Sequence, residues 1–117
     1  MEIKNREDVE FVDDTCGTIQ ELYHSDNLSV AYVVVTGKAK SHMHKVMEEI
    51  YYVEKGRGKL YVGEECYQLR PGDIIPVPKN IYHHLEKTFD EDLEVMVITH
   101  PKYDISDVIE EKPNPKV

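Results

Sequence analysis

Residues 42–56 read HMHKVMEEIYYVEKG, and this stretch decides the fold. Two histidines, His42 and His44, stand two residues apart, and Glu49 follows them. Side chains at positions i and i+2 of a β-strand point to the same face about 7 Å apart, so both imidazoles can reach one ion at roughly 2.0–2.1 Å. On a helix the same two positions lie about 200° apart and cannot share a metal. The two histidines can therefore bind one metal only if this segment is an extended strand.

The chain on either side of this stretch has the pattern of an all-β protein. Short runs rich in Val, Ile and Tyr alternate with turns and recur about every 8–12 residues, the spacing typical of a sandwich or barrel. The predicted strands are residues 18–24, 28–36, 49–53, 59–62, 66–69, 74–77, 82–87 and 93–100. Pro76 cannot donate to a sheet ladder and indicates an edge or irregular strand. We therefore predict an all-β jelly-roll barrel around an interior pocket.

The two ends of the chain carry weaker patterns. Residues 1–14 can add an edge strand, and Asp104–Glu111 can form one or two helical turns with Asp104 or Ser106 as cap. Residues 113–115 predict a loose tail. The expected organisation is a single domain over residues 1–117, with a core barrel over about 28–100, N-terminal strands over 1–27 and a C-terminal extension over 101–117.

Composition narrows the functional classes. Lys and Arg number 14 against 23 Asp and Glu, a net charge of −9, which argues against nucleic-acid binding and against an anionic membrane surface. No apolar run is long enough to span a bilayer, and residues 1–5 do not resemble a signal peptide. Two distant cysteines, Cys16 and Cys66, fit a reduced cytoplasmic protein, and we expect both to be small core or half-buried residues.

A second segment strengthens the metal hypothesis. Gly72 is followed after five residues by Pro78, then by Asn80 and His83. Together the two segments resemble the two motifs of the cupin superfamily, and the resemblance covers roughly residues 28–100. The first motif corresponds here to Gly37, His42, His44, Glu49 and Gly56. The second corresponds to Gly72, Pro78, Asn80 and His83.

Three positions depart from the family pattern. The loop after Gly37 is one residue shorter, with four residues before His42. Asn80 stands where the family usually has glycine, and asparagine is the next best residue at positive φ, so the turn is expected to survive. Lys87 stands where the family often has asparagine, at a position that is not a metal ligand in the family pattern.

The resemblance implies a double-stranded β-helix, or jelly-roll, that holds one divalent transition metal. Its ligands would be His42, His44, Glu49 and His83. Three imidazoles and one carboxylate suit Fe, Mn, Ni, Zn or Cu and do not select among them. Four protein ligands leave one or two coordination positions for a small-molecule ligand.

Two ligand assignments require a choice between neighbours. Glu48 and Glu49 both fit the family spacing, but six residues separate Glu49 from Gly56, and Glu49 alternates in phase with the apolar positions that follow it. Successive strand residues face opposite sides, so only one of His83 and His84 can face the barrel. The spacing from Pro78 favours His83, and His84 is expected on the outer face.

Other polar residues have two interpretations each. Three tyrosines can reach a ligand pocket or, as we prefer, pack the barrel or an interface: Tyr51, Tyr61 and Tyr82. Three lysines form either a positive rim that attracts an anionic substrate or, as we prefer, a solvated basic turn: Lys38, Lys40 and Lys45. Two histidines have no motif support and are expected to be ordinary polar positions: His24 and His100.

The functional hypothesis is a small metalloenzyme of the dioxygenase, isomerase, lyase or decarboxylase type. Its substrate would be a small metabolite that carries a carbonyl or carboxylate group, or a sugar. The alternative is a non-catalytic, metal-containing module that binds a small molecule such as a sugar, and a metal kept only for stability is less natural because structural sites tend to be closed. No catalytic acid or base is identifiable. A homodimer is expected, with Thr18–His24 and Leu93–Thr99 as the main contributors.

Overall fold

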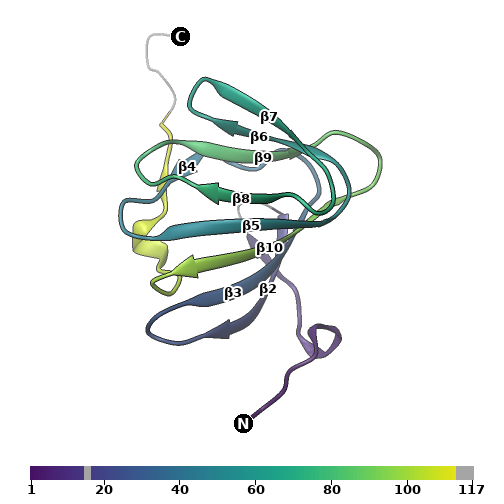
Figure 1. Ribbon diagram of the computed structural model, residues 1–117, viewed down its shortest axis with the longest axis vertical. Coiled ribbons are helices and arrows are strands. Elements are labelled where there is room, and N and C mark those ends of the chain that lie inside the picture. The colour runs from purple at the N-terminus through teal and green to yellow at the C-terminus, as the bar shows by residue number, and fades with distance from the viewer. Residues whose placement is uncertain (15–16, 113–117) are drawn as a thin grey trace.

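Eleven β-strands and two short 3₁₀ helices make up the fold (Figure 1), a computed structural model that describes residues 1–14 and 17–112. In chain order they are η1 (Arg6–Asp8), β1 (Val12–Asp14), β2 (Gly17–His24), β3 (Ser29–Val35), β4 (His42–Met43), β5 (Glu48–Lys55), β6 (Gly58–Val62), β7 (Glu65–Leu69), β8 (Ile74–Val77), β9 (His83–Lys87), β10 (Leu93–His100), η2 (Ile105–Asp107) and β11 (Ile109–Glu110). Within these residues there is no α-helix, and no helical segment has the length and apolar character needed to cross a membrane.

The strands form two antiparallel sheets. One has six strands in the order β1-β2-β3-β10-β5-β8, and the other has five in the order β11-β4-β9-β6-β7. Strands that are distant in sequence are neighbours in both sheets, as β3 and β10 are in Figure 1. This is the jelly-roll architecture that the strand pattern predicts.

The core lies between the two sheets. Along β5 every second side chain is buried, so Glu49, Tyr51 and Val53 face inward while their neighbours face outward. The opposite sheet contributes Leu60 and Leu85, which are 1% and 2% exposed. Burial of such a side chain contributes about 1.5–3 kcal/mol, so these alternating positions fix the register of each strand.

The predicted turns and edges are confirmed at several points. β8, which contains Pro76, is an edge strand of the six-stranded sheet, and β1 is the other edge. Asn80 adopts a positive φ of 62°, the conformation that glycine supplies in the family pattern. Gly56 also has a positive φ, and a Cβ at this position would collide with the backbone carbonyl of Asp92.

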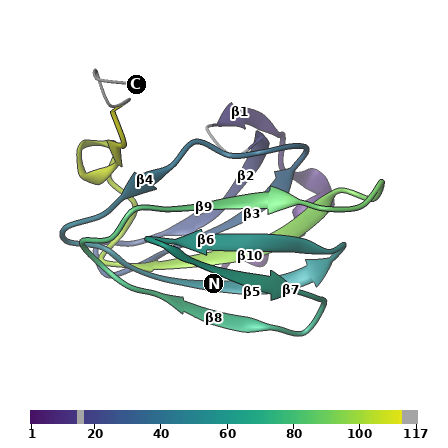
Figure 2. The same cartoon turned by 90° about the horizontal axis from the view of Figure 1, so that it is seen from above.

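The segments around the histidine pair differ from the prediction. β4 has two residues only, so His42 is on the strand and His44 follows its end. The C-terminal segment forms one 3₁₀ turn, capped by Asp104, and then the short strand β11, which pairs with β4. Figures 1 and 2 both show this yellow segment beside β4. The predicted helical turn is therefore correct for η2, whereas the residues after it are extended.

The cysteine prediction is wrong for Cys66, which is exposed on β7. This strand is at the edge of the five-stranded sheet, and four of its five residues are exposed. Cys16 and the tail at residues 113–115 lie outside the described residues.

Candidate metal centre

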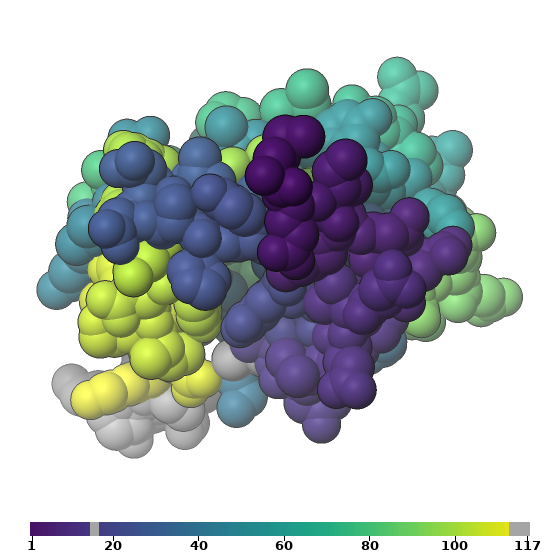
Figure 3. All heavy atoms as spheres, turned by 90° about the horizontal axis from the view of Figure 1, so that it is seen from below, coloured from purple at the N-terminus to yellow at the C-terminus, as the bar shows by residue number. Residues whose placement is uncertain are grey.

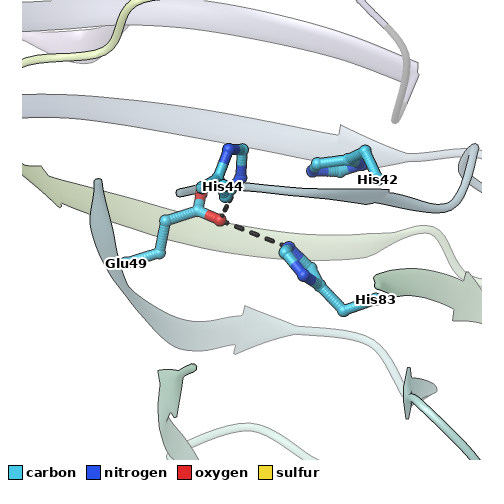
Figure 4. A group of neighbouring side chains, drawn as sticks. All are labelled: His42, His44, Glu49 and His83. Atoms are coloured by element: carbon cyan, nitrogen blue, oxygen red, sulfur yellow. Dashed lines mark ion pairs between the residues drawn. The ribbon is translucent and has the colours of Figure 1, made fainter. Parts of the chain in front are cut away.

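Four buried side chains from both sheets converge inside the barrel. His42 on β4 and His83 on β9 are direct register partners in the five-stranded sheet, and His44 follows β4. Glu49 reaches the same point from β5 in the six-stranded sheet. Figure 4 shows the four side chains pointing toward one another. We refer to His42, His44, Glu49 and His83 as the His/Glu cluster.

The cluster is tight and shielded from solvent. Each residue offers one ligand atom, and these atoms all lie within 4.8 Å of one another. The Glu49 Oε1 atom is 2.7 Å from the His44 Nε2 atom and 3.3 Å from the His83 Nε2 atom. No member of the cluster is more than 8% exposed. The sequence-predicted ligand residues are therefore brought together at one point.

Backbone carbonyls hold one nitrogen of each imidazole. The Nδ1 atoms of His42 and His83 lie 2.9 and 3.2 Å from the carbonyl oxygens of Lys40 and Ile81, each two residues earlier in the chain. The Nδ1 atom of His44 lies 2.9 Å from the carbonyl oxygen of a distant residue. A carbonyl only accepts, so each Nδ1 carries the proton and each Nε2 is left with a lone pair.

In this arrangement, hydrogen-bond acceptors in the cluster face one another with no donor between them. The His44 Nε2, His83 Nε2 and Glu49 Oε1 atoms are buried without a hydrogen-bond partner of suitable geometry. Lone pairs of two imidazoles and a carboxylate at such distances repel unless a positive charge lies among them. A divalent metal supplies that charge, and its imidazole ligands commonly donate their other N–H to a carbonyl. The residues therefore fit a metal ion.

The pKa shifts have the same physical origin. Burial raises the pKa of Glu49, but the adjacent His44 and His83 imidazoles outweigh it and lower the pKa to about 2. Burial lowers the pKa of His44, but Glu49 outweighs that effect and the pKa is raised. Burial lowers the pKa of His42, and no opposing contact overcomes it. The cluster thus favours positive charge beside the Glu49 carboxylate.

The choices between neighbouring residues agree with the geometry. Glu48 is exposed and its Oε1 atom lies 3.7 Å from the Lys79 ammonium, while Glu49 is buried in the cluster. His84 faces away from the cluster, where its ring stacks on Tyr61 with centroids 4.6 Å apart. Each rejected neighbour lies on the opposite face of the same strand.

The other candidates are not members of the cluster. Tyr51 is buried in the core with its ring 6.4 Å from that of His83, and Tyr82 is half-buried. His24 and His100 are exposed. The three lysines do not share a contact. Lys38 and Lys45 are exposed, and the ammonium of Lys40 lies 4.0 Å from the Glu110 carboxylate.

Sequence reasoning missed Asp107. Its carbonyl oxygen is the acceptor for the His44 Nδ1–H group, and its buried carboxylate accepts hydrogen bonds from the loop between β4 and β5. A separation of 63 residues between the two partners leaves no local pattern. The only local signal was the predicted cap at Asp104, which places a turn at this point.

A groove is lined largely by strands of the six-stranded sheet, the sheet that also carries Glu49. It has a volume of about 420 Å³ and is lined by β1, β2, β3, β10 and the residues that follow β10. Thr99, one of its lining residues, is the register partner of Glu49, so the two side chains are neighbours on the inner face. Figure 3 shows this face hollowed between the purple N-terminal segment and the yellow C-terminal segment. The groove therefore reaches β10, the strand next to the one that carries Glu49.

This chain is similar in sequence to a known protein family and to proteins of other organisms. A family model described as "Cupin domain" matches residues 29–99. An uncharacterized protein of Methanocaldococcus jannaschii is 31% identical over 96 residues, which are 76% of this chain and 77% of that protein. An uncharacterized protein of Streptomyces coelicolor is 30% identical over 89 residues, 73% of this chain and 81% of that protein.

Solved structures share the fold at lower identity. Pac13 of Streptomyces, described as a nucleoside dehydratase, has a TM-score of 0.83 and 19% identity, covering 96% of this chain and 92% of Pac13. RemF of Streptomyces resistomycificus, described as a polyketide cyclase, has a TM-score of 0.82 and 18% identity, covering 98% of this chain and 88% of RemF. These likenesses show a common fold.

Proposed function

The chain belongs to the cupin family, and on that premise we propose that it is a small metalloenzyme whose His/Glu cluster holds one divalent transition metal. The observation that carries the proposal is the set of buried Nε2 and carboxylate atoms that face one another without hydrogen-bond partners. Two proteins of the same fold are described as enzymes, a nucleoside dehydratase and a polyketide cyclase, which supports catalysis as a use of this architecture.

The donor set supports Fe, Mn, Ni, Zn or Cu as the resident metal. When bound, such a metal supplies Lewis-acid chemistry at a carbonyl or carboxylate group, or redox chemistry in the case of iron. The chain's own contribution is to orient three imidazoles through their Nδ1–H groups and to keep the cluster dry. Tyr51, the next inward residue of β5 after Glu49, is 3% exposed and its ring lies against that of His83, so it shields the cluster from water.

The groove suggests the class of substrate. Ser29 and Thr99 place two hydroxyls 2.8 Å apart on its floor, next to the position of Glu49. Asp13, Asp14 and Glu21 also line it, and its one lysine, Lys102, lies 3.6 Å from the Asp26 carboxylate. An acidic lining disfavours anions. Within the small metabolites that carry a carbonyl or carboxylate group, and sugars, we therefore propose an uncharged sugar or carbonyl compound.

The test is turnover by protein of defined metal content. Protein purified without added metal is analysed for its elements, stripped, reloaded separately with Fe, Mn, Ni or Zn, and assayed against neutral sugars, keto acids, thiols and sugar phosphates. We expect turnover of an uncharged compound, abolished in Glu49→Gln and retained in the matched control Glu48→Gln. Equal activity of these two variants contradicts the proposal. Saturable binding of a sugar without turnover supports the alternative, a non-catalytic binding module.

We also propose that the chain forms a homodimer through the outer face of the six-stranded sheet. Four outward side chains on β5, β8 and β10 are between 38% and 67% exposed: Ile50, Tyr52, Ile74 and Ile98. They are contiguous, because Ile98 pairs with Ile50 and Tyr52 pairs with Ile74. A two-fold axis uses one such apolar patch twice.

The N-terminal segment limits this patch. It covers the outer face of β2 and β3, where Arg6 lies 3.9 Å over the ring of Tyr32 and Gln20 donates to the carbonyls of Arg6 and Val9. Of the two segments expected to contribute to a dimer, Leu93–Thr99 therefore offers the free apolar surface, and the outer face of Thr18–His24 at Gln20 is already covered.

A further inference from the structure

Asp107 joins the C-terminal segment to the loop that carries the cluster. The side chain is buried, with 8% of the residue exposed. One carboxylate oxygen accepts from the backbone N–H groups of Lys45 (2.9 Å) and Val46 (3.2 Å). The other accepts from those of Val46 (3.0 Å) and Met47 (2.8 Å). Three consecutive N–H groups between His44 and Glu49 thus converge on a single side chain.

The same residue holds an imidazole. The Nδ1–H group of His44 donates to the Asp107 carbonyl oxygen at 2.9 Å. The other two rings donate to carbonyls two residues earlier, so their orientation follows from the local chain. His44 is the member of the cluster whose ring is held by a segment distant in sequence.

The C-terminal segment is anchored on both sides of Asp107. Before it, the Asp104 carboxylate caps η2 by accepting from the N–H of Ser106. After it, β11 pairs with β4, where Glu110 is the register partner of His42. The N–H of Glu111 also donates to the Ser41 carbonyl at 2.9 Å. The pairing of β11 with β4 and the Glu111 contact fix the position of Asp107 relative to β4, whereas the Asp104 contact stays within η2.

A carboxylate is the group that this position requires. The three loop N–H groups need acceptors, and an ionised carboxylate offers two acceptor oxygens and no donor. An amide of the same shape presents one acceptor oxygen and an NH₂ group that faces N–H donors. Leaving a buried N–H unpaired costs about 1–3 kcal/mol, so Asp107→Asn displaces the loop rather than preserving it.

We propose that Asp107 is a positioning residue for the metal centre. Its carbonyl sets the proton on Nδ1 of His44 and turns Nε2 toward the cluster, while its carboxylate fixes the loop between His44 and Glu49. Asp107 lies outside residues 29–99, the part of the chain that matches the family, and its role is specific to the C-terminal segment. The inference rests on the proposed function only in that the cluster binds a metal, and it requires no catalysis.

The experiment compares Asp107→Asn with Asp104→Asn, a matched change in the same segment that does not touch the loop. Metal-free full-length proteins are titrated with Zn²⁺ against a competing fluorescent chelator. Loss of a group that orients a ligand typically costs about 10–100-fold in metal affinity, and we expect this loss in Asp107→Asn. We expect wild-type affinity in Asp104→Asn. Equal affinities of Asp107→Asn and wild type overturn the proposal.

A second readout separates positioning from plain stability. A purely structural loss lowers Tm equally with and without Zn²⁺, whereas weaker binding reduces the rise in Tm that Zn²⁺ produces. We expect a reduced rise in Asp107→Asn only. A rise equal to that of wild type overturns the proposal, and so does a reduction of the same size in Asp104→Asn.

The wild-type protein provides a test that does not depend on a variant folding. Long-range ¹H–¹⁵N spectra of the Zn²⁺-bound protein report the tautomer of each histidine. We expect His44 to carry its proton on Nδ1, and a proton on Nε2 overturns the proposal. If the wild-type protein binds no Zn²⁺, the proposed metal site fails as well. If it binds Zn²⁺ and Asp107→Asn binds equally, only the role of Asp107 fails.

Discussion

Replacing His83 by alanine, with His84→Ala as its control, tests the metal centre at adjacent positions of one strand. The two histidines differ in the side of the sheet they face. His83 is completely buried in the cluster, and His84 stacks on Tyr61 on the other side at an interplanar angle of 14°. The chemical change is identical in both variants, so any difference in metal binding comes from the side of the sheet that each side chain faces.

The size of the effect follows from the number of ligands. Apparent binding free energies for Zn²⁺ at four-ligand sites are roughly 10–16 kcal/mol near neutral pH. An equal share for each ligand is about 2.5–4 kcal/mol, which corresponds to a loss of about 10²–10³-fold in affinity for His83→Ala. The control loses an aromatic stack, which contributes about 0.5–1.5 kcal/mol to folding and nothing to metal affinity.

The assay is a competition titration of the metal-free proteins with Zn²⁺ and a chelator of known affinity. Circular dichroism establishes that each variant retains its β-sheet spectrum before titration. Elemental analysis of the proteins as purified gives a second measure, and we expect metal to be depleted in His83→Ala and retained in His84→Ala.

Two outcomes would refute the reasoning. Equal losses of metal affinity in the two variants would mean that the side of the sheet on which a histidine lies does not decide whether it binds the metal. The ligand from the second motif would then be misassigned. Wild-type affinity in His83→Ala would remove this residue from the ligand set and leave the buried Nε2 atom without an explanation.

Three further predictions concern pH, the groove and the assembly. Zn²⁺ affinity should fall steeply as pH drops below about 6.5, because protons compete with the metal for the imidazoles. Protonation should begin at His44, whose pKa is raised, while Glu49, with a pKa of about 2, stays ionised. Affinity unchanged between about pH 7 and pH 4 would contradict histidine ligation. Ala31→Phe should fill the groove and weaken ligand binding about tenfold or more at unchanged metal content. Isothermal titration with an identified ligand measures this, and unchanged binding would contradict the prediction. Light scattering should give twice the mass of 13.6 kDa for wild type and a monomer for Ile50→Asp, whereas a wild-type mass near 13.6 kDa would exclude the dimer.

Much of the fold could be predicted because it depends on local alternation. Strands with one buried face repeat every second residue, and β10 spans the predicted residues 93–100. The same alternation separates Glu49 from Glu48 and His83 from His84, since each pair straddles the plane of a sheet. Proximity of the cluster followed from the family motifs, because spacing alone does not say which strands of a jelly-roll face one another.

What the sequence did not reveal depends on contacts between distant segments. The role of Asp107 requires β11 to pair with β4, and a two-residue strand has too little alternation to be recognised. Cys66 was expected to be at least half-buried because cysteine usually is, but β7 is an edge strand with an exposed pattern. In both cases the neighbours in space, rather than the residue types, decide the outcome.

The anchors of the three imidazoles divide the metal centre into a local part and a remote part. His42 and His83 are held by carbonyls two residues earlier, so any change that preserves their strands preserves their orientation. His44 lies beyond the end of β4 and takes its anchor from the C-terminal segment. That segment adds only a two-residue strand to the sheet, so it contributes little to the core between the two sheets. Substitution of Asp107 should therefore change metal affinity more than the stability of the barrel, whereas substitutions in the core at Leu60 should do the reverse.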